Sequence, residues 1–315
     1  MTSQPRTVLG KTGLSITRLG YGISALRAAD SSIRPDLTSD DAGRILNEVL
    51  DLGINYLDTA PVYGIAEQLV GRYISHRRNE YFLAGKVGFL AQGLPLYEPR
   101  NADGYAKDWT AKGVRDCVEW SLRAMATDHL DLVQLARAAS VDELETTGAL
   151  EELLALKEEG KVLHLGLTGT LTDLDDQLDR GFHETVQFPY SAFRLDFGPA
   201  IKQVKELGLG TIVRGSGTTR NRQLASSLPE TTGTQEPGST SELDSFLAAG
   251  LDDLLEGETK ISFVLRYTLS NPSIDTTIVG TSNHDHLIEN IEAAIRGPLD
   301  RDVYEEATRR LNQVR

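Results

Sequence analysis

Apolar and polar residues follow two patterns that alternate along the chain. Short continuous apolar runs are typical of buried strands, and apolar residues that recur every three or four positions indicate helices. The strand-like runs cover residues 18–22, 54–58, 81–87, 130–136, 161–168, 185–190, 209–214 and 275–280. A helix-like stretch comes after each of them, and eight such pairs are the number found in a closed (β/α)8 TIM barrel.

Local signals at the ends of the expected helices support this assignment. In the first helix, residues 38–52, Thr38 is suited to cap the first turn, Asp41 completes a capping box, and Gly53 follows the last turn. The other expected helices cover residues 66–74, 110–126, 149–160, 174–181, 199–208, 261–270 and 286–295. The segments 88–109 and 218–241 are expected to be loops, the second because of its polar composition.

Two α/β architectures fit this order of elements, a closed barrel and an open doubly wound sheet. Sheets of the second kind that bind dinucleotides carry a G-x-G-x-x-G motif after the first strand. No such motif follows residues 18–22. We therefore predict an α/β protein in which residues 1–315 form one (β/α)8 barrel domain.

Composition narrows the choice of partners. The chain has 46 acidic and 32 basic residues and a net charge of −14, which disfavours nucleic acids and anionic membrane surfaces. The single cysteine, Cys117, excludes an internal disulfide. The N-terminal segment lacks the apolar core of a signal peptide, and no run approaches 18 apolar residues. We expect a cytoplasmic protein that acts on a small molecule and binds neither nucleic acid nor membrane.

Three residues that could transfer protons stand at or just after the ends of neighbouring predicted strands. Asp58 ends the second strand, Tyr63 follows it in "DTAPVYG", and Lys86 lies near the end of the third in "LAGKVG". In a parallel barrel the active site lies at this end of the strands. A free tyrosine has a pKa of about 10, and a neighbouring ammonium stabilises its phenolate. Each residue alone has an ordinary structural role, but together they predict an acid–base unit in which Tyr63 is the general acid.

Several segments resemble the aldo-keto reductase superfamily, and the similarity extends over nearly the whole chain. They are "INYLDTAPVYGIAEQLVGRYI", "YFLAGKVG", "GKVLHLGLTG", "VQFPYS" and "TTIVGTSNHDHLIENI". The resemblance implies a barrel that binds NADPH, or sometimes NADH, across its mouth and reduces aldehydes and ketones. It implies that Asp58, Tyr63 and Lys86 are three of the four catalytic residues. It also implies an N-terminal β-hairpin around Gly10 to Ser15 that closes the barrel bottom.

The fourth catalytic residue of the family is a histidine at the end of the fourth strand, where this chain has Ala136. None of the six histidines is placed to replace it: His129, His164 and His183 are expected at the barrel bottom, His76 beyond a helix, and His284 and His286 near the adenine. Loss of one hydrogen-bond donor to a developing oxyanion costs about 3–4 kcal/mol. Such a loss slows the reaction without abolishing it. Arg137 or Arg214, at strand ends, could donate instead.

The resemblance also implies a set of cofactor contacts. Gly22 and Ile23 follow the first strand; Thr168 and Gln187 face the nicotinamide amide; Arg214 takes the place of a stacking aromatic; and Ser216 begins a pyrophosphate loop. Gly280, Ser282, Asn283 and His286 lead into a helix whose N-terminal amides suit a phosphate, and Glu289 and Asn290 contact the adenine. The family often has an arginine or lysine near Ser282 for the 2′-phosphate of NADPH. Its absence from this stretch leaves NADH open.

Two other functions fit the same residues. A barrel that binds the nicotinamide cofactor could have become a regulatory subunit, with the three catalytic residues as remnants. An acid–base enzyme without net redox, such as an isomerase, would also use Tyr63 and Lys86. The intact set of Asp58, Tyr63 and Lys86 favours a carbonyl reductase, because a pure binding module has no need of it.

Overall fold

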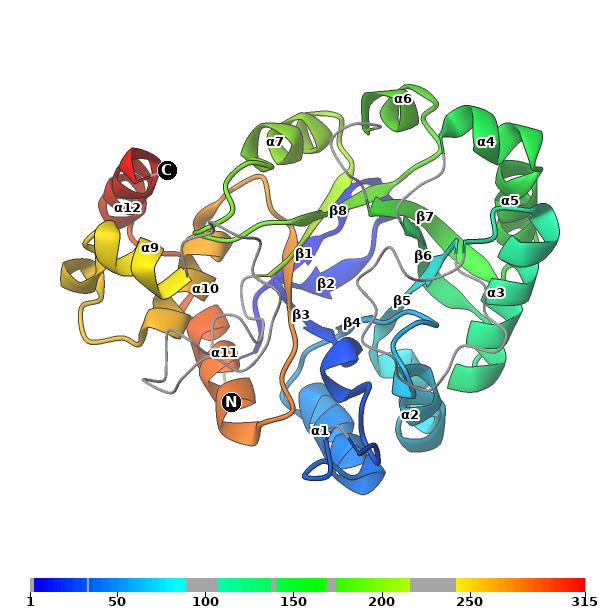
Figure 1. Ribbon diagram of the computed structural model, residues 1–315, viewed down its shortest axis with the longest axis horizontal. Coiled ribbons are helices and arrows are strands. Elements are labelled where there is room, and N and C mark those ends of the chain that lie inside the picture. The colour runs from blue at the N-terminus through cyan, green and yellow to red at the C-terminus, as the bar shows by residue number, and fades with distance from the viewer. Residues whose placement is uncertain are drawn as a thin grey trace.

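The fold is described from a computed structural model, which covers residues 3–32, 34–88, 107–136, 140–168, 174–215 and 242–314. Its centre is a closed barrel of eight parallel strands in the order β10-β3-β4-β5-β6-β7-β8-β9 (Figure 1). The strands are β3 Leu19–Gly22, β4 Tyr56–Asp58, β5 Phe82–Val87, β6 Leu130–Ala136, β7 Val162–Thr168, β8 Thr185–Pro189, β9 Gly210–Arg214 and β10 Thr276–Val279. The predicted (β/α)8 barrel is therefore confirmed.

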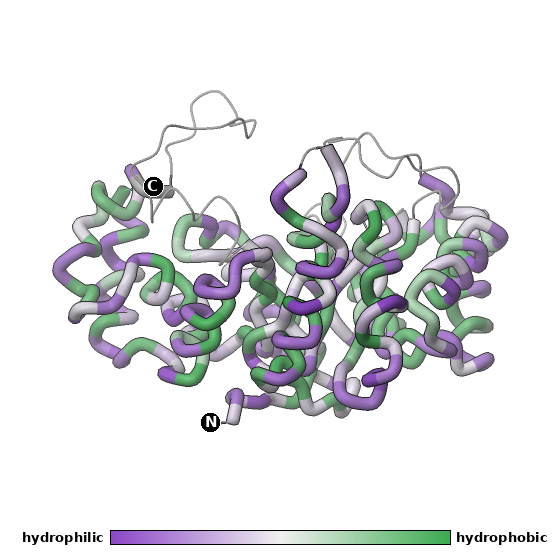
Figure 2. Tube along the Cα trace, turned by 90° about the horizontal axis from the view of Figure 1, so that it is seen from below, coloured by the Kyte–Doolittle hydropathy of each residue, from purple (hydrophilic) through white to green (hydrophobic). Residues whose placement is uncertain are grey.

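A ring of helices surrounds the barrel (Figure 1). The predicted ones are α1 Ser39–Asp51, α2 Ala66–Tyr73, α3 Ala111–Met125, α5 Ala149–Glu158, α6 Leu174–Asp179, α7 Gly198–Glu206, α10 Lys260–Ser270 and α11 His284–Arg296. Helix α1 begins with the expected capping box between Thr38 and Asp41. In Figure 2 polar and apolar residues alternate along these helices, as expected where one face packs and the other is exposed.

Three α-helices in the described residues have no counterpart in the sequence prediction. They are α4 Val141–Thr146, α9 Glu242–Ala248 and α12 Arg301–Gln313, and short 3-10 helices cover Gly10–Thr12 (η1), Ile23–Leu26 (η2), Ser75–Glu80 (η3) and Leu251–Leu254 (η5). A second apolar cluster, beside the main core, joins α9, α10 and α12 through Phe246, Phe263 and Leu311. No helix in the described part of the chain is both long enough and apolar enough to cross a bilayer.

An antiparallel hairpin precedes the barrel, formed by β1 Arg6–Val8 and β2 Ser15–Thr17. A Cβ atom on Gly10 would lie 2.0 Å from the backbone nitrogen of Gly210, so the hairpin touches the first residue of β9. Leu9 and Ile16 are fully buried in the cluster inside the barrel. The hairpin therefore closes the barrel at the N-terminal ends of the strands, as the resemblance implied.

Alternate residues of the strands point into the barrel, and their character changes along its axis. An apolar cluster fills the lower part: Leu9, Ile16, Tyr56, Ala84, Leu132, Ile212 and Ile278. Because the side-chain period of a strand is two, the next inward positions are Asp58, Lys86, Gln134 and Arg214. The apolar cluster thus supports a layer of polar and charged side chains at the C-terminal ends of the strands.

Candidate active site

A buried ion pair lies at the centre of this polar layer. The Lys86 ammonium donates to Asp58 Oδ1 at 2.5 Å and to the backbone oxygen of Thr59 at 2.9 Å. Asp58 and Lys86 are only 5% and 6% exposed. Burial lowers the pKa of Lys86, but the charge and the hydrogen bond of Asp58 act against burial, and the pKa lies above its ordinary value. Lys86 is therefore a charged ammonium at neutral pH.

Two glutamines hold the other oxygen of Asp58. Gln134 Nε2 donates to Oδ2 at 2.9 Å, and Gln187 Nε2 donates to the same oxygen at 3.0 Å. The carbonyl oxygens of both glutamine side chains are buried, and neither has a hydrogen-bond partner among the described residues. Gln187 is one of the predicted cofactor residues, whereas Gln134 is not, although its inward position on β6 is a usable signal in the sequence. The two amides orient Asp58 and leave two acceptors available to a ligand.

Tyr63 reaches this pair from the turn between β4 and α2. Its N–H donates to Ala60 O at 3.0 Å, and its carbonyl accepts from Ala66 N at 2.9 Å, so backbone bonds on both sides fix it. The half-buried side chain packs against the main core, and Lys86 Nζ lies 5.2 Å from the centre of its ring. The structure thus brings together the three residues that the sequence placed in the acid–base unit.

Ala136 occupies the mouth of the barrel at the end of β6. It pairs with Thr168 of β7, lies two positions beyond Gln134, and is 4% exposed. Its methyl group cannot form a hydrogen bond. Arg214, at the end of β9, is exposed, and its positive charge acts on Lys86. Arg137 and Ser216, the other proposed residues near the mouth, lie outside the described residues.

The histidines near the strand starts have structural partners. His129 lies beside Asp128, where its Nδ1 is 2.6 Å from Oδ1. His164 contacts Glu184 at 2.9 Å, and His183 contacts Gln177 at 3.0 Å. Burial lowers the pKa of His183 to about 3, so its ring is neutral. His129 and His183 precede β6 and β8, and His164 is the third residue of β7, so none of the three can replace a group beside Ala136.

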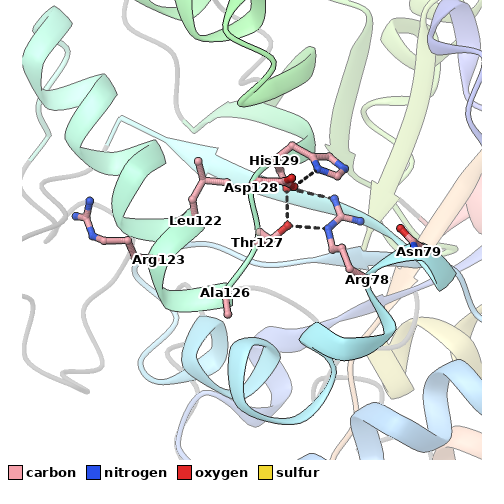
Figure 3. A pocket seen from close by; sticks show the side chains of 8 residues that line it. All are labelled: Arg78, Asn79, Leu122, Arg123, Ala126, Thr127, Asp128 and His129. Atoms are coloured by element: carbon pink, nitrogen blue, oxygen red, sulfur yellow. Dashed lines mark hydrogen bonds and ion pairs between the residues drawn. The ribbon is translucent and has the colours of Figure 1, made fainter.

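A pocket lies at that same lower end of β6 (Figure 3). Its lining residues are Arg78, Asn79, Leu122, Arg123, Ala126, Thr127, Asp128 and His129. Arg78 in this pocket already donates to Asp131 at 2.6 Å and to Thr127 at 3.0 Å. Because these residues precede β6 rather than follow it, the pocket lies away from Lys86 and is not the active site.

The proposed phosphate-binding residues lie at the start of α11. Asn283 caps the helix by accepting from His286 N at 3.1 Å. Arg34, from the loop between β3 and α1, donates to Ser282 Oγ at 3.1 Å and also forms an ion pair with Asp36. Arg34 is not among the residues predicted from the sequence, because a contact between positions 248 residues apart leaves no local signal. The Arg34 guanidinium is therefore a cation near Ser282, although no arginine or lysine lies near Ser282 in the sequence.

The remaining proposed cofactor residues flank this helix. A Cβ atom on Gly280 would lie 3.0 Å from Gly22 O, so the ends of β10 and β3 approach closely. The Ile23 side chain is fully buried in the core, which leaves only its backbone for a ligand. Glu289 accepts from Thr259 Oγ1, whereas the buried amide oxygen of Asn290 has no partner.

Comparison with known proteins places this site in a family. The sequence profile of the Aldo/keto reductase family matches residues 18–311, and the chain belongs to this family. L-galactose dehydrogenase of Arabidopsis thaliana is 28% identical over 313 residues, which cover 93% of this chain and 89% of that protein. The holo form of an aldo-keto reductase from Bacillus halodurans has a TM-score of 0.80 at 27% identity and covers 98% of this chain and 96% of its own. Membership confirms the prediction of an NAD(P)-dependent oxidoreductase.

Proposed function

We propose that this protein reduces an aldehyde or ketone, and that Tyr63 gives the proton to the carbonyl oxygen. The observation that carries the proposal is the buried Asp58–Lys86 pair beside the Tyr63 ring. When Tyr63 gives up its proton it becomes a phenolate, which the Lys86 ammonium stabilises. Asp58 keeps that ammonium charged and oriented. When bound, the reduced nicotinamide supplies the hydride that the carbonyl carbon accepts.

The described residues fit such a cofactor. The unpaired buried oxygen of Gln187 is suited to accept from the nicotinamide amide, and that of Asn290 to accept from the adenine amine. We propose NADPH rather than NADH, because the Arg34 guanidinium stands at Ser282, beside the capped start of α11. Further contacts with the cofactor are proposed for Gly22, Thr168, Gly280, His286 and Glu289.

Ala136 removes one group that the family uses to hold the carbonyl oxygen. We propose that Arg214, the inward-facing cation at the end of β9, donates to that oxygen instead. Its positive charge acts on Lys86, which supports a place near the reacting atoms. Cytoplasmic location and a single domain over residues 1–315 stay predictions.

Relatives suggest which substrates to try. Curated relatives include L-galactose dehydrogenase, D-threo-aldose 1-dehydrogenase of a Pseudomonas species and D-arabinose 1-dehydrogenase of Saccharomyces cerevisiae. The last of these is 35% identical over 130 residues, which cover 40% of this chain and 35% of that protein. The substrate panel therefore has two parts. Aldoses are tested with oxidised cofactor, and aldehydes, ketones and quinones are tested with reduced cofactor.

The test measures cofactor oxidation or reduction with this panel for wild type, Tyr63→Phe and Ala136→His. Tyr73→Phe is the matched control, because it removes only a hydroxyl that bonds Asp40 on the surface. We expect turnover in wild type and in the control, and at least a hundredfold loss in Tyr63→Phe, within the range of general acid catalysis. Cofactor binding without turnover of any carbonyl in the panel would refute the proposed carbonyl reduction. Activity only in Ala136→His would show that the alanine at position 136 is what prevents carbonyl reduction in wild type.

A further inference from the structure

A second carboxyl group lies behind the active site. Glu67 stands on α2, four residues after Tyr63, and is 2% exposed. Its Oε1 accepts from Ser121 Oγ of α3 at 2.9 Å, whereas its buried Oε2 has no partner in the part of the chain that the structure describes. A buried carboxylate with a single hydrogen bond is costly, so proteins rarely keep one without a reason.

The surroundings of Glu67 connect it with Lys86. Burial raises the pKa of Glu67 to about 7, although the Ser121 hydroxyl and the charge of Lys86 both lower it. One turn before Ser121 on the same face of α3, Cys117 Sγ lies 3.7 Å from the backbone oxygen of Lys86. The face of α3 that bonds Glu67 therefore also contacts the backbone of Lys86, whose ammonium pairs with Asp58 inside the barrel.

Other charged groups near α2 are engaged elsewhere. Helix α1 brings Asp40 to Arg72 and Tyr73 at the last turn of α2. The η3 arginines, Arg77 and Arg78, pair with Asp51, Glu80 and Asp131. The η2 segment carries no charged residue, and α3 faces Glu67 with Ser121. Within the described residues, Lys86 is the one charge that acts on Glu67.

We propose that Glu67 is a positioning residue that sets, through Lys86, how firmly Tyr63 holds its proton. This inference rests on the proposed role of Tyr63 as the proton donor. An ionised Glu67 adds negative charge beside Lys86, which stabilises the ammonium and disfavours a phenolate on Tyr63. A protonated Glu67 has neither effect. The state of Glu67 thus changes proton donation without any contact between Glu67 and the substrate.

The first readout is the pH profile of kcat for carbonyl reduction. In wild type we expect an inflection of kcat at about pH 7, where Glu67 ionises. In Glu67→Gln this inflection should disappear, because the amide does not titrate. KM for the carbonyl should stay within about twofold, because Glu67 does not touch it. Glu151→Gln, an exposed glutamate on α5, is the control.

The second readout does not need activity. Infrared difference spectra between pH 5 and pH 9 record the protonated carboxyl of Glu67 in wild type, and Glu67→Gln should lose that band. In Ser121→Ala the midpoint of the band should rise above 7, because the hydrogen bond that favours the ionised form is gone.

The two readouts separate this inference from the proposed function. Activity with the same pH profile in wild type and Glu67→Gln would overturn the role of Glu67 and leave the reductase intact. A normal low ionisation of Glu67 in the infrared titration would also overturn it. Complete inactivity in wild type, with the band present and moved by Ser121→Ala, would refute the proposed function and with it the positioning role.

Discussion

The Asp58–Lys86 pair allows the clearest quantitative prediction. Asp58→Asn keeps the size of the side chain but removes the charge that compensates Lys86. Lys86 is 6% exposed, so its ammonium would remain out of water beside a neutral amide. Removal of one partner from a buried ion pair costs about 3–5 kcal/mol. The new asparagine side chain has two possible orientations. In one of them its NH2 group would face the Nε2 donors of Gln134 and Gln187, so that donor faces donor.

The pH dependence of this loss follows from the sign of each shift. In wild type the pKa of Lys86 is raised by folding. The ion pair therefore stabilises the folded protein below the ordinary pKa of lysine, and this contribution is lost as the pH rises through the pKa of Lys86 in the folded state. In Asp58→Asn the opposing charge is gone, and burial, the largest influence on Lys86, lowers its pKa. The variant should therefore be weakest near neutral pH, and the difference from wild type should shrink as the pH approaches about 10.

Urea denaturation of wild type, Asp58→Asn, Lys86→Met and the double variant measures the effect. We expect Asp58→Asn to lose about 3–5 kcal/mol at pH 7, and Lys86→Met in its background to recover part of that loss, because no unpaired charge then remains buried. A loss below about 1 kcal/mol at pH 7 would refute the reasoning, because that is the size typical of an exposed pair.

Three further predictions test the cofactor site, the lower part of the barrel and the packing of α2. Arg34→Ala should raise KM for NADPH at least tenfold and leave KM for NADH within about twofold, as steady-state kinetics with both cofactors would record; equal effects would exclude a phosphate contact. The pKa of Glu184 is lowered to about 2, where burial opposes but the bonds from His164 and Lys157 prevail. The stability advantage of wild type over Glu184→Gln should therefore be present at pH 6 and vanish as pH falls from about 4.5 to 2, and thermal melts that show a constant difference would contradict this. Gly71→Ala, which would stabilise an isolated helix, should lower the melting temperature, because its Cβ would lie 2.2 Å from a backbone oxygen of α3; an unchanged melting temperature would argue against this packing.

The barrel could be read from the sequence because its strands are continuous apolar runs in regular alternation with helices. The prediction was less accurate at the ends of elements. Strand β4 begins at Tyr56 rather than at residue 54, because Asn55 bonds Thr17 of the hairpin through its side chain. Helix α12 was missed, since few of its residues are apolar and it packs on a separate apolar cluster.

The site was readable only where residues stand at strand ends. Asp58 and Lys86 could be found there, and Tyr63 lies in the turn that follows. The contacts of Gln134 with Asp58 and of Ser121 with Glu67 join positions 76 and 54 residues apart. Only the closed barrel and the packing of α2 on α3 bring these side chains together.

In the reaction that we propose, the carbonyl carbon receives a hydride from the nicotinamide while Tyr63 protonates the oxygen. The most direct measurement uses NADPH deuterated at the transferred position of C4, with a substrate of the panel, and analyses the alcohol by mass spectrometry. We predict deuterium on the carbinol carbon with wild type and a rate at least a hundredfold lower with Tyr63→Phe. Alcohol without deuterium from either C4 position, or equal rates in the two proteins, would contradict this account.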